Sequence, residues 1–224
     1  MSLYDLNDAQ EQRADGVVPD GTFCTLCMKI RPGGENIAGA SADDIGLFKE
    51  SMTSDVRYID AEFTIIDGPH EGRKLWKNFT IAGGKVGEDG VSKAWHISKS
   101  FFRAAVDSAL NLSPKDMSDA SKAKRNLPSF RSMDGLEFHV KVGIERGGAM
   151  PGGGQYPDKN RIAHVVVPGE PQYALMKAGK EITPAPSQTE DPVASTPPWQ
   201  QDKPAIDLAT PTSAGPAWLK GDKK

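Results

Sequence analysis

Five stretches of the sequence alternate between apolar and polar residues with a period of two. The clearest one has apolar residues at every second position: Leu136, Phe138, Val140, Val142 and Ile144. Successive side chains of a strand point to opposite faces, so this alternation predicts a strand with one face in a core. The same period predicts strands over residues 22–30, 56–66, 73–81 and 161–167.

A helical period separates the third predicted strand from the fourth. Apolar residues fall at i, i+3, i+4, i+7 and i+8 from Phe102 onward, which predicts an amphipathic helix from Ser92 to Leu112 that ends before Pro114. Three strands, one helix and two strands form the plan of the OB-fold, a five-stranded barrel that binds oligonucleotides or oligosaccharides. A small β-sandwich also accommodates short alternating strands, but the position of the helix favours an all-β barrel with one helix.

Composition divides the chain into three parts. Residues 1–17 form an acidic N-terminal arm, residues 18–180 form the predicted OB-fold domain, and residues 181–224 are rich in Pro, Ala, Ser and Thr. The last part has no hydrophobic period and cannot bury enough apolar area to offset its ordering entropy, so we expect a disordered tail. No apolar run approaches the ~20 residues that cross a bilayer, and no export signal is present, so we expect a cytoplasmic protein without membrane contact.

Positive charge is concentrated in one region. The chain has a formal net charge of -3, yet twelve Lys or Arg face six Asp or Glu between His70 and Arg131. The third predicted strand carries rings together with these cations. Exposed aromatic rings let unpaired bases stack, and neighbouring cations hold phosphates, so this strand is typical of a surface that binds single-stranded nucleic acid.

We predict a DNA-binding surface from the outward faces of the strands and from the loop near Gly152. Its ten candidate residues are Phe23, Lys29, Tyr58, Arg73, Lys74, Trp76, Lys77, Tyr156, Lys159 and Arg161. Phe79 shares the spacing of Leu75 and Ile81, which favours a core position for it, and Trp76 would then face outward. The alternative is that Trp76 is also a core residue and the lysines are ordinary surface charges.

Two further segments could contact DNA. The glycine-rich loop over 147–157 could close over a strand or could be a plain linker. The connector that contains Lys122, Lys124, Arg125 and Arg131 could bind phosphates or could be solvated surface.

Catalytic and metal-binding motifs are not apparent. Cys24 and Cys27 form a C-x-x-C without a second pair, and residues three apart on a strand face opposite sides, so we expect two reduced thiols. The four histidines are scattered. Asp43 with Asp44, and Asp60 with Glu62, could bind a metal as in nucleases, but alternating carboxylates on an exposed strand are more often solubility charges. We therefore expect no enzyme, no metal and no cofactor.

The quoted segments resemble a known family. Val-Pro-Asp-Gly-Thr-Phe near the start, Ile-Asp-Gly-Pro-His-Glu-Gly-Arg-Lys-Leu-Trp-Lys-Asn-Phe, and the later Val-Lys-Val-Gly-Ile-Glu are similar to phage-encoded OB-fold single-stranded DNA-binding proteins, over roughly Val18 to Val167. The resemblance implies sequence-tolerant DNA binding in phage DNA replication or recombination, in the host cytoplasm. It places Arg73, Lys74 and Trp76 on the DNA-facing strand, whereas residues 32–55 and the tail depart from the family pattern.

A second hypothesis is an OB-like protein-interaction module of the replication or packaging machinery. It is motivated by the net acidity and by Trp199 and Trp218, two isolated rings in the tail. Under either hypothesis the tail is expected to contact replication or recombination proteins, and the oligomeric state is open.

Overall fold

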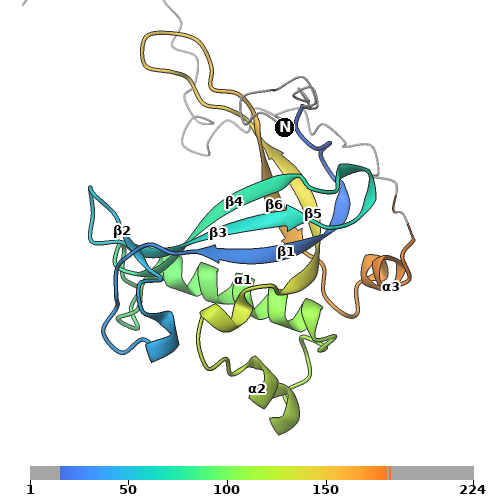
Figure 1. Cartoon of the computed structure of the whole chain (residues 1–224), viewed down its shortest axis with the longest axis horizontal. Helices are drawn as coiled ribbons and strands as arrows, with labels where there is room; N and C mark the ends of the chain where they lie inside the picture. The colour runs from blue at the N-terminus through green and yellow to red at the C-terminus, as the bar shows by residue number, and fades with distance from the viewer. Residues whose placement is uncertain (1–15, 181, 183–224) are drawn as a thin grey trace, which may run out of the picture. The chain divides into compact units, whose positions relative to one another are not determined.

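The computed structural model describes residues 16–180 and 182, all of which belong to one compact unit of the chain. Its main element is an antiparallel sheet of six strands (Figure 1). The strands are β1 (Phe23–Arg31), β2 (Lys49–Glu50), β3 (Arg57–Ile65), β4 (Lys74–Ala82), β5 (Glu137–Glu145) and β6 (Lys159–Val165). The long strands pair in the order β4-β3-β1-β5-β6, and the short β2 pairs with the first two residues of β3.

Helix α1 (Lys93–Ala109) follows β4 and crosses one face of the curved sheet (Figure 1). Ser92 caps its N-terminus by accepting a hydrogen bond from the backbone N–H of Trp95, which satisfies one of the amides that a helix start leaves unpaired. Asn111 stands at φ 52 just after the helix, and this left-handed residue stops it before the predicted end at Leu112.

The apolar face of the sheet packs against α1 and forms the core. The predicted alternation is confirmed here, because Leu26, Ile59, Phe63 and Val140 are fully buried while their sequence neighbours face the other way. Five phenylalanines form an aromatic cluster across this interface, with ring centroids 4.7 to 6.3 Å apart: Phe63, Phe79, Phe101, Phe102 and Phe138. Edge-on and tilted pairs of this kind add to the stability from area burial alone.

Two parts of the fold prediction are wrong. The sheet is not closed into a barrel, since no backbone pairing joins β4 to β6 in the part of the chain that the structure describes. Lys77 of β4 and Arg161 of β6 come close at these two edges, and two cations do not favour tight pairing there.

The described residues also contain three α-helices rather than one. The two additional helices, α2 (Asp119–Arg125) and α3 (Pro171–Lys177), have seven residues each, too few to show a clear hydrophobic period. Each depends on a tertiary contact. Arg125 at the end of α2 pairs with Asp107 of α1, and Tyr173 of α3 is buried and donates a hydrogen bond to the Ser108 carbonyl.

Two predicted loops prove to be ordered. In residues 32–55, Leu47 and Phe48 are buried, and the carboxylate of Asp44 accepts hydrogen bonds from the backbone N–H groups of Phe130 and Arg131. The glycine-rich segment between β5 and β6 is a hairpin arm that extends away from the sheet (Figure 1), closed by a hydrogen bond from the Tyr156 N–H to the Gly148 carbonyl at 2.8 Å. The acidic arm and the tail lie outside the described residues, apart from residues 16, 17 and 182.

Candidate nucleic-acid interface

The outer face of the sheet is the side that points away from α1. We use this name for nine side chains of β1, β2, β3 and β4: Lys29, Arg31, Lys49, Tyr58, Asp60, Glu62, Lys74, Trp76 and Asn78. Strand register aligns them in rows, with Lys29 opposite Glu62 and Glu62 opposite Trp76. Four strands thus present one continuous surface.

Trp76 is the most prominent ring of the outer face. Its side chain is 57% exposed, whereas Leu75 and Phe79 on the same strand are 3% and 1% exposed. The prediction that Trp76 faces outward and Phe79 faces the core is confirmed. The indole N–H donates a hydrogen bond to Glu62 Oε2 at 3.3 Å, which holds the ring against β3 and leaves much of its surface open.

Cations on the outer face are paired with two carboxylates. Lys74 Nζ lies 2.7 Å from Glu62 Oε1, and this hydrogen bond holds the pKa of Glu62 below its usual value. Asp60 lies 2.6 Å from Lys49 Nζ and 3.5 Å from Arg31 Nε. Lys29, Arg31, Lys49 and Lys74 against Asp60 and Glu62 leave a local excess of 4 - 2 = +2. The surface is therefore mildly positive.

The far end of the same sheet face is covered by α3. His139 of β5 contacts the Tyr173 ring at a centroid distance of 5.3 Å, and its Nδ1 lies 3.1 Å from the Thr25 hydroxyl. Burial lowers the pKa of His139 from its usual value. Phe23 lies at this end as well, with Lys141 Nζ 5.9 Å from its ring centroid, so Phe23 is separated along β1 from the row that contains Trp76.

A second group of predicted residues lies at the gap between β4 and β6. Lys77 shares the core-facing spacing of Leu75 and Phe79, and its ammonium stands 5.6 Å and 5.4 Å from the ring centroids of Phe79 and Phe101. Partial burial lowers the pKa of Lys77, and the charge of Arg161 lowers it further. Lys159 pairs with Glu145 at 3.3 Å. Lys77 thus does not share the outer face of Trp76, and Lys159 and Arg161 lie on β6, at the opposite edge of the sheet from β4.

The structure therefore divides the ten predicted residues. Lys29, Tyr58, Lys74 and Trp76 share the outer face; Lys77, Lys159 and Arg161 lie at the gap between β4 and β6; Phe23 lies at the far end of β1; Arg73 donates a hydrogen bond to the Gly16 carbonyl; and Tyr156 is exposed on the hairpin arm.

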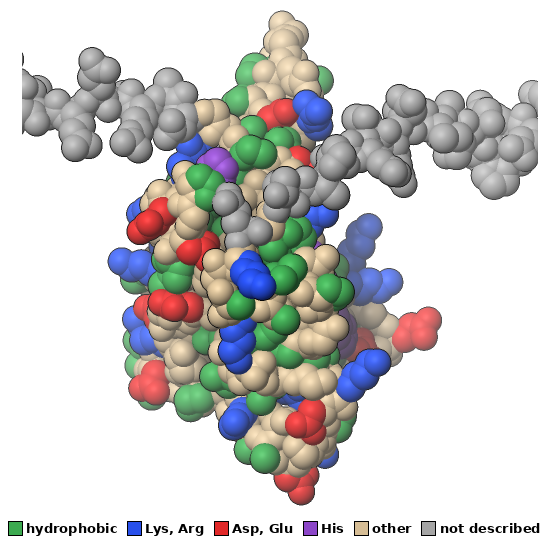
Figure 2. Space-filling view, turned by 90° about the vertical axis from the view of Figure 1, so that its right-hand side faces the viewer, with side chains coloured by type: hydrophobic (Ala, Val, Ile, Leu, Met, Phe, Trp, Pro, Cys, Tyr) green, Lys and Arg blue, Asp and Glu red, His purple; other side chains and the backbone are tan. Residues whose placement is uncertain are grey.

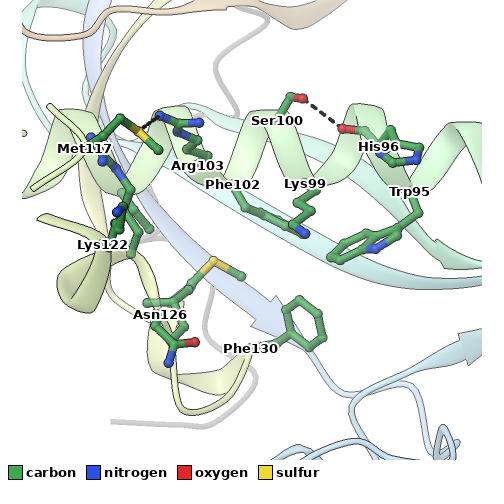
Figure 3. A pocket seen from close by; sticks show the side chains of 14 residues that line it. Trp95, His96, Lys99, Ser100, Phe102, Arg103, Met117, Lys122, Asn126 and Phe130 are labelled. Carbon is green, nitrogen blue, oxygen red and sulfur yellow. Dashed lines mark hydrogen bonds between the residues drawn. The ribbon is translucent and has the colours of Figure 1, made fainter. Parts of the chain in front are cut away.

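A groove that the sequence analysis did not anticipate lies between α1 and α2. We call it the α1–α2 groove; it encloses about 790 Å³, and Trp95, Lys99 and Phe102 extend from α1 toward Phe130 on its other wall (Figure 3). Its remaining lining residues are His96, Ser100, Arg103, Val106, Met117, Lys122, Arg125, Asn126, Leu127 and Met133. The alternating pattern of the strands gives no sign of it, because residues far apart in the chain form it.

Two cations of the basic connector donate hydrogen bonds to other parts of the protein and are not free on the surface. Arg125 donates to Asp107 Oδ1 at 2.6 Å and also to the backbone carbonyls of Asp116 and Ser113. Arg131 Nε donates to the Asp43 carbonyl at 2.8 Å. Lys122 is exposed, with only a loose pair to Asp119 at 3.6 Å.

Metal and thiol chemistry find no obvious site in residues 16–180. No group of three or more His, Cys, Asp or Glu side chains there could hold a metal ion. Cys24 is buried and Cys27 is half-buried, and both are free thiols. Burial raises the pKa of Cys24 to about 12, so this thiol is not a nucleophile near neutral pH.

No family model and no curated protein matches the chain. Within the described part, none of the helices has the length and apolar character that a membrane crossing requires. On the face next to α3, basic and acidic side chains are interspersed (Figure 2).

Proposed function

We propose that the protein is a sequence-tolerant single-stranded DNA-binding protein of the OB type, acting in phage DNA replication or recombination without catalysis. The observation that carries this proposal is Trp76, an exposed indole on a sheet face that also presents Lys29 and Lys74. Stacking of a base on such a ring contributes about 1 to 3 kcal/mol and does not depend on the base identity.

The order of the elements supports the OB reading. The long strands run β1, β3, β4, then α1, then β5 and β6. The OB-fold is a five-stranded, partly open Greek-key barrel. The gap between β4 and β6 fits a partly open version. In OB-folds, strand faces and adjoining loops bind oligonucleotides, and here these would be the outer face and the hairpin arm that carries Tyr156.

Electrostatics limits the strength of this interaction. Four outer-face cations would contact phosphates, and counterion release for single strands follows a slope of about -0.7 per phosphate contact, so we expect the log affinity to fall with log salt at a slope of about -2 to -3. A phosphate near Lys74 competes with Glu62 for the same ammonium. We therefore expect affinity to be moderate and strongly salt-dependent.

Binding of labelled oligo-dT, about 20 nucleotides long and thus longer than one OB site, tests the proposal by fluorescence anisotropy at several salt concentrations. Trp76→Ala should weaken binding by about 1 to 3 kcal/mol with little change in melting temperature. Ile97→Ala, at a side chain of α1 that is 71% exposed, is the matched control and should leave affinity unchanged. Absence of binding at low salt, or equal binding to duplex DNA, would contradict the proposal.

A further inference from the structure

The α1–α2 groove combines an apolar floor with a basic rim. Phe102 and Met133 are buried in its floor, and Trp95, Leu127 and Phe130 are half-buried around them. Its volume of about 790 Å³ lies in the range of about 300 to 1,000 Å³ that is typical of ligand-binding pockets.

Charge on the rim has one sign. The lining contains the cations Lys99, Arg103, Lys122 and Arg125 but no Asp or Glu, and His96 at its edge pairs with Asp89 at 2.7 Å. Arg125 is committed to Asp107, and Arg103 donates to the Pro114 carbonyl at 2.9 Å. Lys99 and Lys122 are exposed, and the loose Lys122 to Asp119 pair at 3.6 Å is of the kind that contributes little, so both ammonium groups are available to an incoming carboxylate.

The ring geometry favours side chains over bases as occupants. Trp95, Phe102 and Phe130 pack against one another at interplanar angles of 53° to 79°, with centroids 6.0 to 6.4 Å apart. Their faces are thus partly covered by neighbouring edges, unlike the open indole of Trp76, and a base needs an open ring face for stacking. An apolar side chain needs only contact area, which a mixed aromatic and aliphatic floor provides.

We infer that the α1–α2 groove is a docking site for an acidic linear segment of a partner protein, one that inserts a bulky apolar side chain between Trp95, Phe102 and Phe130. Carboxylates flanking that side chain pair with Lys99 and Lys122. An amphipathic helix or turn that lays its apolar side into a groove is a recurring mode of peptide recognition, and the basic rim selects acidic flanks. This inference does not depend on DNA binding, because it uses a surface separate from the outer face.

The test begins with a display library of random peptides about 12 residues long, selected on the full-length protein, because a helical turn or two suffices for this mode. Enriched peptides should contain Trp, Phe or Leu flanked by Asp or Glu. One of them, synthesised with a fluorescent label, should shift the indole N–H resonance of Trp95 and leave that of Trp76 in place.

Charge reversal supplies the decisive comparison. The double variant Lys99→Glu with Lys122→Glu should lower the affinity of the acidic peptide by about tenfold or more, because the new carboxylates repel those of the peptide. Lys93→Glu with Lys115→Glu changes the net charge equally at exposed positions outside the groove and should have little effect. Enrichment without acidic residues, or equal loss in both double variants, would overturn the inference.

Competition separates this inference from the proposed function. Oligo-dT should not displace the peptide, and the groove variant should retain oligo-dT affinity within about twofold of the Lys93 and Lys115 control, since both lose the same long-range charge. If oligo-dT displaces the peptide and its own affinity falls only in the groove variant, the groove is a nucleic-acid site and the inference is wrong. If oligo-dT does not bind at all while the peptide does, the proposed function fails and the docking site stands.

Discussion

The outer face and the α1–α2 groove both combine aromatic rings with cations, yet they differ in what surrounds the cations. On the outer face Lys74 pairs with Glu62, and both Lys49 and Arg31 pair with Asp60. No carboxylate lines the groove, and its exposed lysines have at most a loose partner. The aromatic rings differ as well. The Trp76 ring is exposed on the outer face, whereas the rings in the groove pack against one another.

This contrast teaches that rings and cations together do not define a nucleic-acid site. An open ring among partly neutralised cations favours stacking with moderate electrostatics, as expected for a sequence-tolerant strand binder. Packed rings beneath available cations favour an apolar side chain with acidic flanks. Each surface can be altered without the other, which makes the comparison testable.

The largest effect is expected at Phe79, the core counterpart of Trp76 on β4. Phe79→Ala should lower the free energy of unfolding by about 3 to 5 kcal/mol, because it leaves a cavity among Phe63, Phe101 and Phe102. Trp76→Ala should change it little. Urea unfolding of both variants measures the contrast, and a large loss in Trp76→Ala would mean that the two faces of β4 are assigned in reverse.

Arg125 tests which groove cations belong to the fold. Arg125→Ala should cost about 3 kcal/mol of stability, because Asp107 is then left buried with only Arg103 at 3.7 Å as a partner. Lys124→Ala, at an exposed position one residue earlier, should change stability by less than about 0.5 kcal/mol. Equal melting temperatures for the two variants would show that the Arg125 to Asp107 pair does not hold α2 on α1.

Glu62 tests whether carboxylates weaken the outer face. Glu62→Gln keeps a hydrogen-bond acceptor for the Trp76 indole but frees the Lys74 ammonium, so oligo-dT affinity should rise about two- to fivefold at low salt. The binding of an acidic peptide to the groove should not change. Anisotropy with both probes measures this, and a decrease in oligo-dT affinity would place the DNA elsewhere.

His139 tests the covered end of the sheet and should give the smallest effect. Burial, with Lys177 adding to it and Asp67 opposing, holds the pKa of His139 below its usual value. The unfolded chain then binds more protons below about pH 6.5, so stability is complete above that pH and falls as the pH drops toward the folded pKa. His139→Gln should show a shallower decrease of melting temperature between pH 7 and pH 5. Identical pH profiles would contradict the burial of this ring under α3.

The sequence by itself determined the five long strands, the central helix and the direction of their faces. A period of two over nine residues favours one burial pattern, and the expectation that Leu75 and Phe79 face the core while Trp76 faces away from it is confirmed. Strand ends shifted by one or two residues, since terminal residues carry little of the periodic signal.

Tertiary structure alone decided the rest. Lys77 lies at a core-facing position of β4 but is accessible at the gap between β4 and β6. Its accessibility exists because the sheet does not close there. The seven-residue helix α2 and the groove beside it depend on the pair between Arg125 and Asp107, which are 18 positions apart. Local periodicity predicts which side of a strand is apolar. It does not predict which distant residues come into contact, because that depends on how the elements pack.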